Sequence, residues 1–168
     1  MNFIVVGTDH RFQRREPGLC GLLRALLGQR YVVEFGAIAE ELHEDIGGPT
    51  IAQLLAKRYK LCWYNLDMTM VEKQEAGIWK EQKSRPTLCA ATTVWRVPSD
   101  GLREDAWVAK LIASPSCNTL VICGYLHLEA LAKRLTAGGC TVDKRVYLET
   151  VPTIQLMEPT AGCVNSRS

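Results

Sequence analysis

Two short motifs in this sequence place a histidine at the same distance from a glycine. Gly7 precedes His10 by three positions, and Gly124 precedes His127 in the same way. In both cases an apolar run of strand length leads into the glycine, which permits a tight turn or a close approach of the backbone. Imidazole side chains bind metals and transfer protons near neutral pH. The two motifs therefore mark candidate site residues.

Acidic residues follow two other expected strands. Glu40 and Glu41 come after the second strand, and Asp67 follows the third. In open parallel sheets, ligands bind outside the carboxyl ends of the strands. Two imidazoles and three carboxylates at such an edge suit acid–base chemistry or a divalent metal, the one cofactor this pattern indicates. A metal would be held by His10, His127 and one of the two glutamates, with Glu41 as the assigned ligand.

Each of these residues also has a structural interpretation. Both motif histidines could serve helix ends, and Asp67 is equally suited to be an N-cap. Adjacent carboxylates are commonly a solvated strand end. If the strand continues, Glu40 and Glu41 point to opposite faces, so that at most one of them reaches the site directly. Arg103 could pair with an acidic neighbour on the surface of its helix.

The elements that must position these residues alternate along the chain. Strands are expected at about residues 3–6, 35–39, 61–66, 119–123 and 141–147. Helices are expected from Pro17, from Thr50, and over about 71–83, 99–113 and 127–136. This order predicts a three-layer α/β fold with a mostly parallel sheet of about five strands and flanking helices. We expect a single domain over 1–168, with an insertion or lid at about 84–98 and a frayed tail at 160–168.

Composition limits the choice of partners. The chain of 168 residues has a formal net charge of +2, so bulk electrostatics favour neither nucleic acid nor a membrane as a partner. The apolar start is too short for a signal peptide, and no run approaches the length of a membrane span. We therefore expect a cytoplasmic protein with a small-molecule or peptide substrate, no nucleic-acid or membrane partner, and an oligomeric state that the sequence leaves unknown.

The seven cysteines include no Cys-x-x-Cys pair and are odd in number. Cys62, Cys123 and Cys140 fall in or beside expected buried strands. Reduced thiols that pack as small apolar side chains are therefore favoured over disulfides. The third histidine, His43, lies in a strongly polar stretch and is expected on the surface.

In this order the motifs resemble those of the TraB/PrgY/GumN/Tiki superfamily, which includes erythromycin-esterase-like and ChaN-like haem-binding proteins, and more narrowly small bacterial proteins of that type. The resemblance is carried by Val6–His10, Ile38–Glu41, Asn65–Asp67, Arg103–Trp107 and Ile122–His127. It implies an α/β fold with a site where the motifs converge, and metal-dependent hydrolysis in some members.

Carried over by this resemblance, His10 and His127 match the motif histidines. Glu40 and Glu41 match the acidic pair, and Arg103 matches a polar helix position. These five residues form the expected catalytic set.

Two functional hypotheses remain open at this point. The leading one is an esterase-like or peptidase-like hydrolase, in which an imidazole, a carboxylate or a bound metal activates water. Arg103 would then stabilise the developing negative charge, with Gly7, Asp67 and Gly124 assigned to substrate binding. The competing hypothesis is a binding protein that uses the same edge for a metal, haem or small anion without turnover. A scaffold role is third.

Overall fold

The structure is a computed structural model that describes residues 1–28, 34–42, 47–84, 93–149 and 153–156. Its centre is a sheet of five parallel strands in the order β3-β2-β5-β1-β6. These strands are β1 (Asn2–Thr8), β2 (Ala37–Glu40), β3 (Cys62–Asn65), β5 (Asn118–Gly124) and β6 (Thr141–Tyr147). The predicted α/β class and parallel sheet are thus confirmed, and the apolar runs of β1 and β5 lie side by side in the sheet.

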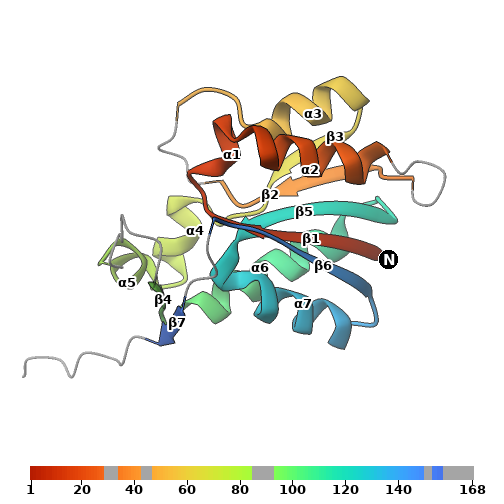
Figure 1. The fold of residues 1–168 in the computed structure, drawn as a ribbon. Helices are drawn as coiled ribbons and strands as arrows, with labels where there is room; N and C mark the ends of the chain where they lie inside the picture. Colours follow the sequence, from red (N-terminus) through yellow and green to blue (C-terminus); the bar gives the residue numbers. More distant parts are fainter. Residues whose placement is uncertain (29–33, 43–46, 85–92, 150–152, 157–168) are drawn as a thin grey trace, which may run out of the picture.

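Helices cover both faces of this sheet (Figure 1). One face carries α1 (Phe12–Arg15), α2 (Pro17–Gly28) and α3 (Ile51–Tyr59), and the other carries α6 (Asp100–Ala113) and α7 (Leu128–Ala137). Each face buries its own apolar cluster, because successive side chains along a strand point to opposite faces. Both helix layers therefore pack on the same sheet, and they flank the ends of its strands.

Local capping explains where two helices begin. Thr50 caps α3 by accepting the N–H of Gln53, whose side chain in turn accepts the N–H of Thr50. Thr69 and Glu72 form the same reciprocal pair at the start of α4 (Met70–Glu75). Each capping box satisfies backbone donors that the first helical turn leaves without a partner.

The predicted single helix over about 71–83 is wrong in one respect. Two short helices occupy this stretch, α4 and then α5 (Trp79–Ser84). Between them Gly77 has φ of +72°, a left-handed conformation that glycine adopts at low cost. The chain therefore turns where a continuous helix was expected.

A second, smaller sheet follows α5. Its two parallel strands are β4 (Thr93–Arg96) and β7 (Thr153–Leu156). Together with α4 and α5, these strands lie beyond the carboxyl ends of the main sheet (Figure 1). The segment expected as an insertion or lid at 84–98 is described only at its ends, because residues 85–92 lie outside the described ranges. The expected tail at 160–168 lies outside them as well.

The described cysteines are free thiols, namely Cys20, Cys62, Cys117, Cys123 and Cys140. Cys123 is buried in the central strand, whereas Cys62 is exposed because it begins the edge strand β3. The remaining Cys89 and Cys163 lie outside the described residues. Among the helices that the structure describes, none has the length and apolar character needed to cross a membrane.

Candidate active site

Polar side chains from four strand ends meet at the carboxyl edge of the sheet. They follow β1, β2, β3 and β5 in turn, and they are His10, Glu41, Asp67 and His127. A fifth side chain, Arg103, comes from α6. Parallel strands end at one common edge, so residues far apart in the sequence become neighbours there.

Arg103 lies at the centre of this group and is fully buried. Its Nη2 donates to Glu41 Oε1 at 2.7 Å and to Asp67 Oδ1 at 2.8 Å, and its Nε donates to Asp67 Oδ1 at 3.0 Å. Burial alone would lower the pKa of Arg103, but the two carboxylates override this effect and raise its pKa above the ordinary value. The guanidinium therefore stays charged in the interior.

The remaining nitrogen of Arg103 is also engaged. Nη1 lies 3.3 Å from Gln82 Oε1 and 3.3 Å from His127 Nε2. A guanidinium has five N–H donors, and these contacts together with those of Nη2 and Nε use all five. In this arrangement Arg103 holds its neighbours in place and has no donor left for an oxyanion.

The contacts of His127 indicate which of its ring nitrogens is the donor. Its Nδ1 lies 2.9 Å from Glu104 Oε1, an acceptor, while its Nε2 faces the donor Nη1 of Arg103. This pattern favours the tautomer with the proton on Nδ1 and the lone pair on Nε2. The ring is fully buried and packs edge-on against Trp107, with the centroids 4.8 Å apart. Both nitrogens of His127 are thus committed to protein contacts.

Glu104 is a site residue that the sequence reading missed. Besides His127, its carboxylate contacts Arg96 at 2.6 Å and Arg134 at 2.9 Å. Burial by itself would raise the pKa of Glu104, but the bonds from His127 and Arg96 hold it below the ordinary value. A signal was present, because Glu104 and Arg103 occupy the same helical stripe as the apolar Trp107 and Leu111. Charged residues at core positions of such a stripe require buried partners.

Asp67 is held from two directions. It accepts from Arg103 and also from Lys73, whose Nζ lies 2.6 Å from Asp67 Oδ2. The cations outweigh both burial and the nearby Glu41, so the pKa of Asp67 is lowered. The alternative role of Asp67 as an N-cap is not observed, because Thr69 caps the following helix.

Glu41 connects the two motif histidines. Its Oε2 accepts the backbone N–H of Gly124 at 2.8 Å and lies 3.6 Å from His10 Nε2. Its Oε1 lies 3.7 Å from His127 Nε2. A Cβ atom at Gly124 would come within 2.7 Å of His10 Nε2, so glycine at this position allows the imidazole to approach the strand end. The motif glycine thus controls how close His10 comes to Glu41.

His10 differs from His127 in its exposure. Its side chain is 28% exposed, whereas that of His127 is 0% exposed. His10 Nδ1 lies 3.2 Å from Gln13 Oε1, and the Nε2 of Gln13 donates to the backbone oxygen of Glu41 at 3.0 Å. Of the two motif histidines, His10 is therefore the one that solvent and a ligand can reach.

Glu40 points away from this group, to the face covered by α1, α2 and α3. Its Oε2 accepts from Thr50 Oγ1 at 2.6 Å and from Trp63 Nε1 at 3.2 Å. Within the described part of the chain, its buried Oε1 has no hydrogen-bond partner. Burial raises the pKa of Glu40 to about 7, although both hydrogen bonds act in the opposite direction. The two adjacent glutamates thus lie in different environments.

Gly7 faces α7, where a Cβ atom would come within 3.0 Å of the Leu128 side chain, so its contact is with the core of the fold. His43 lies outside the described residues. In the ranges that the structure describes, no three His, Cys, Asp or Glu side chains are grouped so that they could hold a metal ion. The buried positive charge of Arg103 instead neutralises the carboxylates at this edge.

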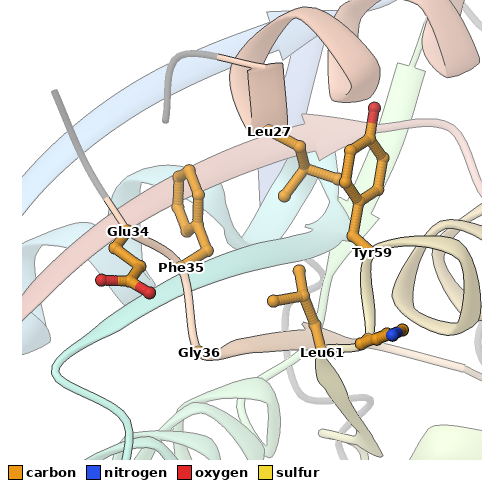
Figure 2. A pocket seen from close by; sticks show the side chains of 7 residues that line it. Leu27, Glu34, Phe35, Gly36, Tyr59 and Leu61 are labelled. Carbon is orange, nitrogen blue, oxygen red and sulfur yellow. The ribbon is translucent and has the colours of Figure 1, made fainter. Parts of the chain in front are cut away.

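A separate pocket of about 400 Å³ lies at the opposite edge of the sheet (Figure 2). It is lined by Leu27, Glu34, Phe35, Gly36, Tyr59, Lys60 and Leu61, and it lies where β2 and β3 begin. None of the residues of the Arg103 group lines it.

Comparison of the chain with protein-family models, with curated proteins and with solved structures finds no match.

Proposed function

We propose that the protein is a hydrolase of ester-type or amide-type substrates in which His10 is the general base. The observation that supports this proposal is the contrast between the two motif histidines. His127 has both nitrogens bound within the protein, whereas His10 is partly exposed and presents Nε2 beside the Glu41 carboxylate. A general base must reach both the proton it removes and the solvent-accessible substrate.

The reaction would proceed through a water molecule placed next to His10 Nε2. The water oxygen attacks the carbonyl carbon of the substrate while Nε2 takes the proton, so a tetrahedral intermediate and an imidazolium form together. When the intermediate collapses, the bond to the leaving group breaks and the imidazolium returns the proton to that group. The products are a carboxylic acid and an alcohol or amine, and His10 is neutral again.

Glu41 would stabilise the imidazolium formed during this step. Its Oε2 lies 3.6 Å from Nε2 and is itself buried, so the carboxylate attracts the positive charge that forms on the ring. Arg103 and the N–H of Gly124 hold the carboxylate in place. Arg103 thus acts as a positioning residue, in place of the charge-stabilising role expected from the sequence. This scheme uses no metal, in keeping with the donor arrangement described above.

The ordered motifs support the same class of reaction through their resemblance to the TraB/PrgY/GumN/Tiki superfamily, some members of which hydrolyse their substrates. The proposal is tested with a panel of carboxylic esters and amides, with and without chelator, on the wild type and two variants. We expect His10→Gln to lower kcat/KM on the order of 10²-fold or more. His43→Gln, which removes the third histidine, serves as the matched control and should keep wild-type rates.

Two results would contradict the proposal. One is full activity of His10→Gln on a substrate that the wild type hydrolyses. The other is no turnover across the panel combined with tight binding of a metal, haem or small anion that depends on the histidines, which would favour the binding-protein hypothesis.

A further inference from the structure

We propose that Gln13 is a positioning residue that fixes the tautomer of His10, with the proton on Nδ1 and the lone pair on Nε2. The inference deepens the proposed function, because it supplies Nε2 in the form that a general base needs. The tautomer itself is a property of the protein that can be measured with no substrate present.

The Gln13 amide has one orientation that its contacts allow. Its Nε2 lies 3.0 Å from the backbone oxygen of Glu41, which can only accept a hydrogen bond. The amide nitrogen must therefore be on that side, because the reverse orientation would bring two oxygens together. The Oε1 of Gln13 then has to face His10.

The contact between Gln13 and His10 determines which ring nitrogen is the donor. Oε1 lies 3.2 Å from His10 Nδ1, and an amide oxygen only accepts. Nδ1 must therefore carry the proton. Nε2 lies 3.6 Å from Glu41 Oε2, which is longer than a hydrogen bond. In neutral imidazole one nitrogen is a donor and the other an acceptor, so the lone pair falls on Nε2.

The burial of Gln13 supports a specific role for its side chain. Gln13 is 2% exposed, and it belongs to the four-residue helix α1, which follows the carboxyl end of β1. A buried amide is costly unless its donor and acceptor are both bonded, and here the two bonds reach two different parts of the site. Gln13 thus connects the first histidine motif to the end of the second strand.

The second motif reaches the same tautomer by different chemistry. There the carboxylate of Glu104 accepts from Nδ1 of His127, and Nε2 also faces Glu41. A fixed partner on one ring nitrogen commonly sets the role of the other. The two Gly-x-x-His motifs therefore present equivalent nitrogens to one carboxylate, with a neutral amide as the orienting group for the exposed ring and a carboxylate for the buried one.

The experiment is two-dimensional ¹H–¹⁵N NMR of the imidazole rings in the full chain at a pH where His10 is neutral. His10→Gln identifies the signals of this ring by their loss. Gln13→Met removes both polar groups at nearly the same side-chain length. Gln82→Met is the matched control, because Gln82 is a second amide in the same network, and its bonds are to Ser99, Asp100 and Arg103.

In the wild type we expect His10 to show a protonated Nδ1 and an unprotonated Nε2. In Gln13→Met the ring should become a mixture of both tautomers, while Gln82→Met keeps the wild-type pattern. If a hydrolysed substrate is known by then, Gln13→Met should also lower kcat by at least about tenfold with little change in KM.

A wild-type His10 with its proton on Nε2, or an unchanged tautomer in a folded Gln13→Met protein, would overturn the inference. If Gln13→Met fails to fold, Gln13→Asn replaces it, since its amide is one methylene too short to span both partners. The two proposals fail in different ways. Loss of the tautomer assignment leaves hydrolysis measurable, and a lack of turnover leaves the NMR result unchanged.

Discussion

The two sides of the sheet edge bury acidic groups by opposite means. On the α6 side, the carboxylates of Asp67 and Glu104 are matched by cations from Arg103, Lys73, Arg96 and Arg134. On the α1–α3 side, the described residues that donate to Glu40 are a hydroxyl, from Thr50, and an indole N–H, from Trp63. Charged partners lower a carboxyl pKa, whereas burial with neutral donors raises it.

This contrast separates stability from chemistry at the candidate site. On the α6 side, both ring nitrogens of His127 have partners within the protein. His10 lies on the α1 side of Glu41, where the ring is partly exposed. We therefore expect changes on the α6 side to act mainly on folding, and changes at His10 to act mainly on activity. Substitutions on each side can test this division.

The largest effect should come from Arg103→Met. Removing a fully buried guanidinium leaves Glu41 and Asp67 without their shared cation, and breaking a buried ion pair costs about 3–5 kcal/mol. Urea denaturation should show this loss in the free energy of unfolding. Arg145→Met is the control, because Arg145 is about half exposed and its pair with Asp143 is worth about 0–1 kcal/mol. Equal losses in both variants would remove the distinction between the buried network and a surface pair.

The next effect is a pH dependence that should disappear in Glu40→Gln. Because the pKa of Glu40 is about 7 in the folded protein, the folded state holds a proton that the unfolded state releases near 4.5. The contribution of Glu40 to the free energy of unfolding is therefore fully present below about pH 4.5. It falls by on the order of 2–3 kcal/mol as the pH rises to about 7.

Denaturation curves at several pH values between these limits measure this slope. Glu75→Gln, at an exposed glutamate, should retain it. The α6 side should have the opposite sign, since the lowered pKa values of Asp67 and Glu104 stabilise the fold at neutral pH and this stability is lost as the pH falls below about 4. A wild-type profile with the same slope as Glu40→Gln would mean that Glu40 is ionised in the folded protein.

A smaller effect should distinguish the two histidines themselves. His127→Gln removes a fully buried ring that contacts Glu104 and Arg103, and we expect a loss of about 1–3 kcal/mol. His10→Gln should cost less than about 1 kcal/mol, because its side chain is partly exposed. Thermal melts of both variants provide the comparison. A greater loss for His10→Gln would reverse the proposed division between the two sides.

The smallest change in stability is expected for Gly124→Ala. The added methyl group would lie 2.7 Å from His10 Nε2 and 3.3 Å from Glu41 Oε2, so the imidazole must move. Because His10 is partly exposed, this movement should cost no more than about 1 kcal/mol. The His10 ring signals should nevertheless shift in NMR spectra, and any hydrolytic rate should fall. Unchanged His10 signals would show that the glycine is not required for the approach of the ring to Glu41.

Much of the fold was contained in local patterns. Short apolar runs alternate with helical stripes, and this order leaves few topologies other than a parallel sheet between helices. The same reasoning placed His10, Glu41, Asp67 and His127 at one edge, because parallel strands end together. These inferences succeed because periodicity and chain order are properties of the sequence itself.

Only the tertiary structure decided which partners these residues have. Arg103 was equally consistent with a surface ion pair, and its burial depends on elements that pack over it from across the chain. The separation of Glu40 from Glu41 was expected from strand alternation, but the raised pKa of Glu40 depends on Thr50 and Trp63, which neighbouring segments supply. The pairing of β4 with β7 likewise joins distant segments. Such contacts depend on the whole fold, since burial and hydrogen bonding are set by groups that are neighbours in space and not in sequence.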